Sequence, residues 1–171
     1  PENIVAELEF LKRNFRFRSV LFNDDTLNVN RKHAIELCDL MVKRRVGMPW
    51  AAYSRVDSID KEVAAKMAKA GCFLVKVGFE SGCNEMLKNM RKGGNATVEQ
   101  AKKAAKIFKD AGIQVHGTFV FGMPGETHET IRRTVDFAKE LDIDFVQFSV
   151  AQPYPGTEFF EYLKNRGYLH F

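Results

Sequence analysis

The chain has 171 residues, enough to bury the core of one domain, and we expect a single domain spanning residues 1–171. Hydrophobic residues make up 45% and charged residues 28% of it, which excludes a disordered chain, and the net charge of +4 is too small to indicate nucleic-acid binding. No apolar run approaches the roughly 20 residues that span a bilayer, and the first residues do not resemble a signal peptide. We therefore expect a cytoplasmic protein without membrane contact.

Amphipathic helices and short apolar runs alternate along the chain. The helices are expected near residues 1–15, 31–45, 60–71, 84–91, 97–112, 127–141 and 157–166, and the strands near 17–23, 49–54, 72–79, 113–121 and 145–150. Asn30, Asp60 and Thr97 are expected to cap the helices that follow them, and the pair Gly93-Gly94 to break the chain.

This order predicts an α/β fold with a parallel sheet built from right-handed crossovers. An open doubly wound sheet and part of a TIM-like barrel both satisfy it. Within the strands, however, one set of alternate positions is polar: Lys76, Gly78 and Glu80, then His116 and Thr118, then Gln147 and Ser149. A flat sheet covered on both faces would bury these side chains, whereas a curved sheet turns them toward a lumen, so the pattern favours a barrel.

The opposite positions are apolar and are expected to pack under the helices. They include Phe73, Val75, Phe119, Phe121, Val146 and Phe148. The carboxyl ends of all five strands lead into polar or glycine-rich segments, where parallel α/β proteins place their sites. Single residues there could also have purely structural roles. Arg55 could pair with Asp57, and Asp24 and Asp25 could cap a turn.

Five segments, in this order, resemble the radical S-adenosylmethionine (radical SAM) enzymes, especially the branch with a cobalamin-binding domain. They are residues 1–3 with 7–11 (PEN and ELEFL), 21–26 (LFNDDT), 78–82 (GFESG), 121–127 (FGMPGET) and 154–157 (YPGT). The resemblance implies a partial (β/α) barrel whose 4Fe-4S cluster cleaves S-adenosylmethionine reductively and so starts radical chemistry on a small-molecule substrate. It also implies an electron donor as partner and, through a preceding domain, cobalamin.

The family holds its cluster with a C-x-x-x-C-x-x-C loop after the first barrel strand, and this sequence has no such motif. Cys38, Cys72 and Cys83 are scattered, so no metal ligands are expected in this chain. The simpler explanation is a truncated barrel core covering about strands two to six, inactive alone, whose partner is the missing N-terminal segment. A naturally cluster-free relative is the alternative. The unpaired edge beside residues 17–23 is expected to promote self-association.

The resemblance also implies the site residues. For the cofactor these are Asp24, Asp25, Arg55, Glu80, Ser81, Val120 and Gly122, and for the substrate region Tyr53, Gln147, Gln152 and Tyr154. Glu80 and Ser81 would face the methionine and ribose parts, Asp24 and Asp25 the amino group, and Val120 to Gly122 the adenine.

Two other functions remain open at this point. One is a cluster-free barrel lyase or isomerase using Glu80, Lys76 or His116 as acid and base, and the other is a binding domain without catalysis. The sequence does not identify the catalytic residues, the substrate or the reaction outcome.

Overall fold

The computed structural model describes residues 1–90 and 96–169 and contains every expected element. Its helices are α1 (Glu2–Asn14), α2 (Arg31–Lys43), α3 (Lys61–Lys69), α4 (Asn84–Asn89), α5 (Val98–Asp110), α6 (His128–Glu140) and α7 (Glu158–Lys164). Its strands are β1 (Val20–Phe22), β2 (Trp50–Ser54), β3 (Cys72–Glu80), β4 (Gln114–Phe121) and β5 (Phe145–Val150). The first strand is shorter than expected, and the Gly93-Gly94 break lies outside the described residues.

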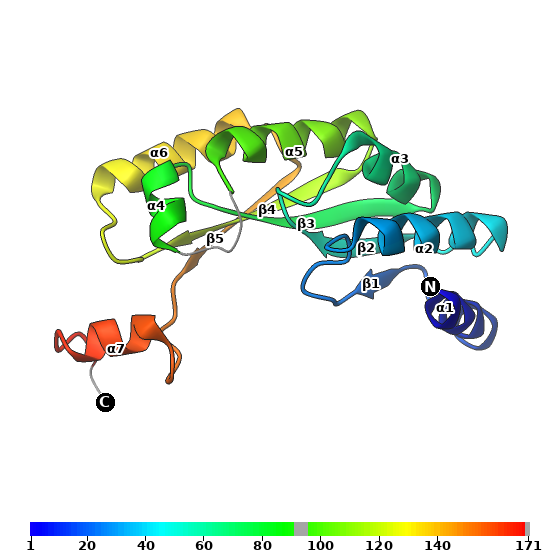
Figure 1. The fold of residues 1–171 in the computed structure, drawn as a ribbon, viewed down its shortest axis with the longest axis horizontal. Coiled ribbons are helices and arrows are strands. Elements are labelled where there is room, and N and C mark those ends of the chain that lie inside the picture. The colour runs from blue at the N-terminus through cyan, green and yellow to red at the C-terminus, as the bar shows by residue number, and fades with distance from the viewer. Residues whose placement is uncertain (91–95, 170–171) are drawn as a thin grey trace.

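The strands form one parallel sheet in the order β1-β2-β3-β4-β5. Each strand therefore pairs with the next along the chain, and the order never reverses as it does in a doubly wound sheet. Right-handed crossovers in this order place the helices on one side, where Figure 1 shows α2, α3, α5 and α6. The sheet is thus an arc of a (β/α) barrel, as the alternation of polar residues predicted.

Local signals fix where the helices begin. The side chains of Asn30 and Asp60 accept hydrogen bonds from the backbone N–H groups of His33 and Val63, so both expected caps are confirmed. Thr97 opens α5 with a reciprocal capping box.

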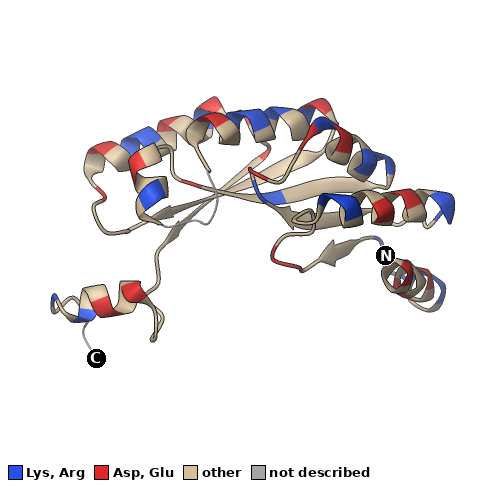
Figure 2. Cartoon of the chain, viewed as in Figure 1, with Lys and Arg blue, Asp and Glu red and all other residues tan. Residues whose placement is uncertain are grey.

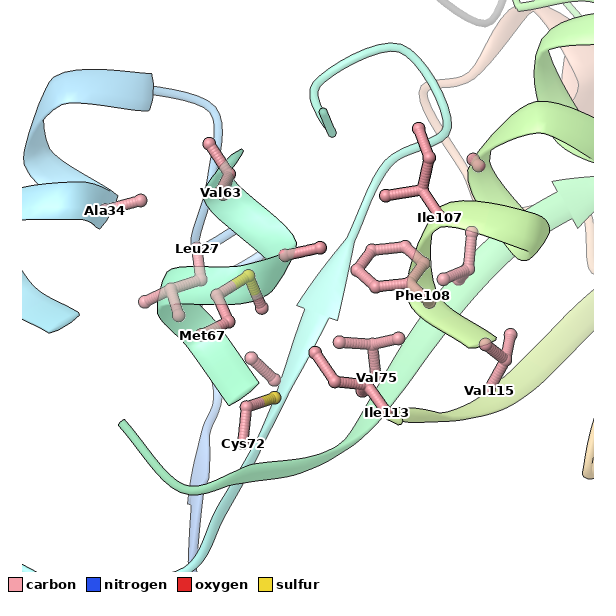
Figure 3. Packing of buried hydrophobic residues seen from close by; sticks show 14 of the residues in the cluster. Leu27, Ala34, Val63, Met67, Cys72, Val75, Ile107, Phe108, Ile113 and Val115 are labelled. Carbon is pink, nitrogen blue, oxygen red and sulfur yellow. The ribbon is translucent and has the colours of Figure 1, made fainter. Parts of the chain in front are cut away.

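The core lies between the sheet and the helix layer. Figure 3 shows Val75 of β3 and Val115 of β4 packed with Phe108 of α5, and Met67 of α3 lies in the same cluster. Val75, Val115, Phe108 and Met67 are each fully buried. Because apolar side chains fill this side of the strands, the alternate residues must face the other side, toward the lumen.

Three of the apolar positions differ from the expectation. Phe73 is 41% exposed, because the register shifts between Trp50 and Ala51 and leaves Phe73 as the extra residue of a bulge. Val146 and Phe148 keep the helix side of β5 but are 43% and 44% exposed. They lie on the last strand of the sheet, beyond the cover of α6, and α7 lies apart from the helix layer (Figure 1).

Charge is concentrated on the helices, as Figure 2 shows, while the strands are almost free of it. None of the helices in residues 1–90 and 96–169 combines the length and the apolar composition that a membrane span requires.

Candidate functional site

The carboxyl ends of the strands lead into the segments expected to hold the site. Glu80 is the last residue of β3 and has a φ of 65°, a conformation that non-glycine residues seldom adopt. The N–H of Ser81 donates to the carbonyl of Phe79 at 2.8 Å, closing a hydrogen bond across Glu80 in the pattern of a classic γ-turn. Such strain persists where the surrounding structure enforces it and is frequent at functional sites.

Ser81 does not face the lumen. It is 1% exposed, its hydroxyl lies 3.1 Å from Oγ1 of Thr134 in α6, and it accepts a hydrogen bond from the N–H of Cys83. Thr134 also accepts from the N–H of Gly82 at 3.0 Å. The Ser81 hydroxyl thus anchors the turn to α6, on the helix side of the sheet, and this arrangement leaves Glu80 as the polar side chain of the turn.

Gly122 follows β4 with a φ of 87°, which suits glycine. Its N–H donates to Oε2 of Glu126, while Oε1 of Glu126 is buried and has no hydrogen-bond partner among the described residues. Val120, just before, is half-buried. The segment offers a bare backbone beside an apolar side chain, an arrangement that lets a flat ring approach closely.

The remaining cofactor candidates are less enclosed. Asp24 and Asp25 are both exposed in the loop after β1. Arg55 follows β2 and makes two hydrogen bonds to Asp57, of 2.9 and 2.7 Å, which confirms their expected pairing. This pairing raises the pKa of Arg55.

The substrate-region candidates divide into two groups. Tyr53 of β2 and Gln147 of β5 belong to strands of the sheet, and the Nε2 of Gln147 donates to Ser149 at 3.2 Å. Gln152 and Tyr154 are exposed in the segment after β5, where Tyr154 accepts hydrogen bonds at the start of α7.

The cysteines do not fit an iron-sulfur cluster. Cys38, Cys72 and Cys83 are buried in different elements, and burial raises the pKa of all three thiols, those of Cys38 and Cys72 to about 12. Among the residues that the structure describes, no group of three His, Cys, Asp or Glu side chains could hold a metal ion. The position of the cluster ligands therefore stays a prediction.

Sequence reasoning missed two features here. Glycine at position 82 is required because a Cβ atom there would lie 2.6 Å from Cβ of Phe137 and 2.7 Å from the carbonyl oxygen of Arg133. The unpartnered carboxylate oxygen of Glu126 was also missed, and only the proximity of Gly122 in sequence hinted at it.

Fold and site together define a (β/α)-barrel protein with its polar groups at the carboxyl ends of the strands. The family model of the radical SAM superfamily matches residues 1–138, so the chain belongs to that superfamily. An uncharacterized methyltransferase of Pyrococcus horikoshii is 37% identical over 161 residues, covering 94% of this chain and 35% of that protein. An anaerobic magnesium-protoporphyrin IX monomethyl ester cyclase of Rubrivivax gelatinosus is 29% identical, covering 97% of this chain and 30% of that protein.

Among solved structures, the chain resembles the radical S-adenosylmethionine methyltransferase TsrM of Kitasatospora setae, which was solved with cobalamin and a 4Fe-4S cluster bound. The TM-score is 0.81 and the identity 28%, covering 90% of this chain and 31% of TsrM. The likeness to the cobalamin branch is therefore confirmed. The chain spans about a third of the length of these relatives.

Proposed function

We propose that the full-length protein containing this chain is a cobalamin-dependent radical SAM methyltransferase that acts on a small molecule. The observation that carries the proposal is the likeness to TsrM, since it combines a TM-score of 0.81 with 28% identity over 90% of this chain. The Pyrococcus relative, also named a methyltransferase, supports the same reaction class.

Glu80 is our main candidate for holding S-adenosylmethionine. The cofactor carries an ammonium and a sulfonium, and a carboxylate at a strained turn after β3 gives these charges a partner fixed in position. Val120 and Gly122 would flank the adenine, because Gly122 has no side chain to block the ring. Asp24, Asp25 and Arg55 are secondary candidates, and Ser81 would act by holding the turn.

The 4Fe-4S cluster would supply the electron that cleaves S-adenosylmethionine. Its ligands would come from outside these residues, since the three thiols here are buried in different elements. An external electron donor would reduce it, and a further domain would bind cobalamin. This chain would contribute the barrel wall and its polar strand ends.

Turnover by the full-length protein tests the proposal. The protein is purified without oxygen, reconstituted with iron, sulfide and cobalamin, and given a reductant and S-adenosylmethionine labelled on its methyl group, with tryptophan or magnesium-protoporphyrin IX monomethyl ester as trial substrates. We expect S-adenosylmethionine to be consumed and its label to appear on cobalamin or on a trial substrate. A fully cluster-loaded protein that consumes none would overturn the proposal, and consumption without label transfer would overturn methyl transfer.

A further inference from the structure

The lumen face of the sheet carries one row of side chains that the proposed cofactor site does not use. The strand register places Tyr53 beside Lys76, Lys76 beside His116, and His116 beside Phe145. Because neighbouring strands are about 4.8 Å apart, these four residues, the lumen row, lie side by side on β2, β3, β4 and β5. Lys76 precedes Glu80 by four residues, roughly 13 Å along β3.

Lys76 brings an isolated positive charge to this row. Lys76 and Glu80 are the only Asp, Glu, Lys or Arg residues in the five described strands. Lys76 is half-buried, its ammonium lies 5.8 Å from the ring centroid of Tyr53, and no carboxylate of residues 1–90 or 96–169 forms an ion pair with it. A half-buried ammonium without an ion-pair partner attracts an anion more strongly than a fully solvated one does, so the lumen row favours an anion.

His116 is a second hydrogen-bonding group beside this charge. It is half-buried, and its ring centroid lies 6.2 Å from that of Phe145. Burial and the positive charge of Lys76 lower the pKa of His116, against an opposing effect of Gln147. An anion placed between Lys76 and His116 would offset the positive charge of Lys76 and raise the pKa of His116. It would thereby favour the protonated imidazole, which donates hydrogen bonds from both nitrogens.

We infer that the lumen row binds a carboxylate of the substrate, with Lys76 and His116 as the donors and with Tyr53 and Phe145 as the aromatic walls. Two donors on adjacent strands suit the two oxygens of a carboxylate. The flanking rings suit an apolar body attached to it. The inference rests on the proposed function, since it names the substrate class: a carboxylic acid with an apolar or aromatic body. The distance along β3 separates this carboxylate from a cofactor held at Glu80.

The histidine pKa measures binding directly. Full-length protein labelled with ¹³C-histidine is titrated with pH and followed by NMR. The titration is repeated at constant ionic strength in chloride, in acetate, in inorganic phosphate and in S-adenosylmethionine. The signal of His116 is assigned from its absence in the His116→Gln variant. We expect saturating acetate to raise the pKa of His116 by about one unit, a tenfold gain in proton affinity. A response to phosphate without one to acetate would overturn the carboxylate assignment, and an equal response to S-adenosylmethionine would assign the row to the cofactor.

Substitution of Lys76 separates a specific site from general charge effects. In Lys76→Met, and in the more conservative Lys76→Gln, we expect the acetate response of His116 to disappear. Lys103→Met, which removes an exposed charge from α5, should leave that response intact. An acetate response in both Lys76 variants equal to that of the unsubstituted protein would overturn the inference. This titration does not depend on turnover. If acetate leaves the pKa of His116 unchanged while the full-length protein still consumes S-adenosylmethionine, carboxylate binding by the lumen row is rejected and the proposed function stands.

Discussion

Gly82 and Phe137 approach so closely that a single added Cβ atom on Gly82 would lie 2.6 Å from Cβ of Phe137. The turn after β3 and helix α6 therefore meet backbone to backbone, and the N–H of Gly82 bonds to Thr134 at the same contact. Because this contact holds the segment that presents Glu80, the glycine serves the site through packing.

Replacing Gly82 with Ala should lower the free energy of unfolding by about 1–3 kcal/mol, because neither the backbone of α6 nor the turn can move without breaking core packing. Chemical denaturation measures the change. Gly112→Ala is the comparison, since a Cβ there meets nothing within 4 Å and carries only the cost of its φ of 75°. Since Gly82 has no positive φ, a loss below about 0.5 kcal/mol in Gly82→Ala would show that close packing there is unimportant.

Replacing Glu80 with Gly should separate stability from function. Glycine adopts a φ of 65° without strain, and we expect this relief to offset its greater backbone entropy, leaving the unfolding free energy within about 1 kcal/mol of the starting value. Affinity for S-adenosylmethionine in the full-length protein should nevertheless fall. A variant several kcal/mol less stable would show that Glu80 acts mainly in the fold.

The three thiols should be inert in the folded protein. Burial raises their pKa, and only the thiolate reacts, so Ellman's reagent at pH 8 should label them far more slowly in buffer than in guanidinium chloride. We also expect this chain alone to assemble no 4Fe-4S cluster. Fast labelling, or a stoichiometric iron-sulfur absorption band, would contradict the burial seen here.

Asp60 should contribute to acid sensitivity. A hydrogen bond from Arg31 of 2.7 Å and the capping bond from Val63 hold its pKa below the ordinary value of 3.8. Its stabilising contribution is therefore complete at neutral pH and is lost as the pH falls below about 4. Because the pair is about half exposed, we expect Asp60→Asn to cost at most about 1 kcal/mol at pH 7 and less at pH 3. An equal cost at both pH values would exclude the ionic contribution.

The order of elements could be predicted from periodicity and caps, since Asn30, Asp60 and Thr97 each begin the helix that the sequence indicated. The alternation of polar and apolar residues along the strands also placed Lys76 and His116 on the face of the sheet opposite their buried neighbours. Phe73 could not be assigned in this way, because a bulge depends on how β2 and β3 pair and leaves no trace in the alternation of one strand.

The site was less predictable than the fold. The sequence shows Ser81 next to Glu80 with no sign that their side chains diverge, because the γ-turn at Glu80 is imposed by contacts of Ser81 and Gly82 with α6. The close approach of Gly82 to Phe137 joins residues 55 positions apart, and only the tertiary structure reveals it.

The central claim is that these strand ends hold the cofactor. Calorimetry tests it most directly, by titrating S-adenosylmethionine into the cluster-loaded, full-length protein and into its Glu80→Gln variant. Glutamine keeps the shape of the side chain and removes its charge, so we predict that the binding free energy weakens by about 1 to 3 kcal/mol, roughly 5-fold to 150-fold in affinity. The control Glu129→Gln, at the exposed start of α6, should leave the affinity unchanged. Unchanged affinity in a folded, cluster-loaded Glu80→Gln protein would contradict the account.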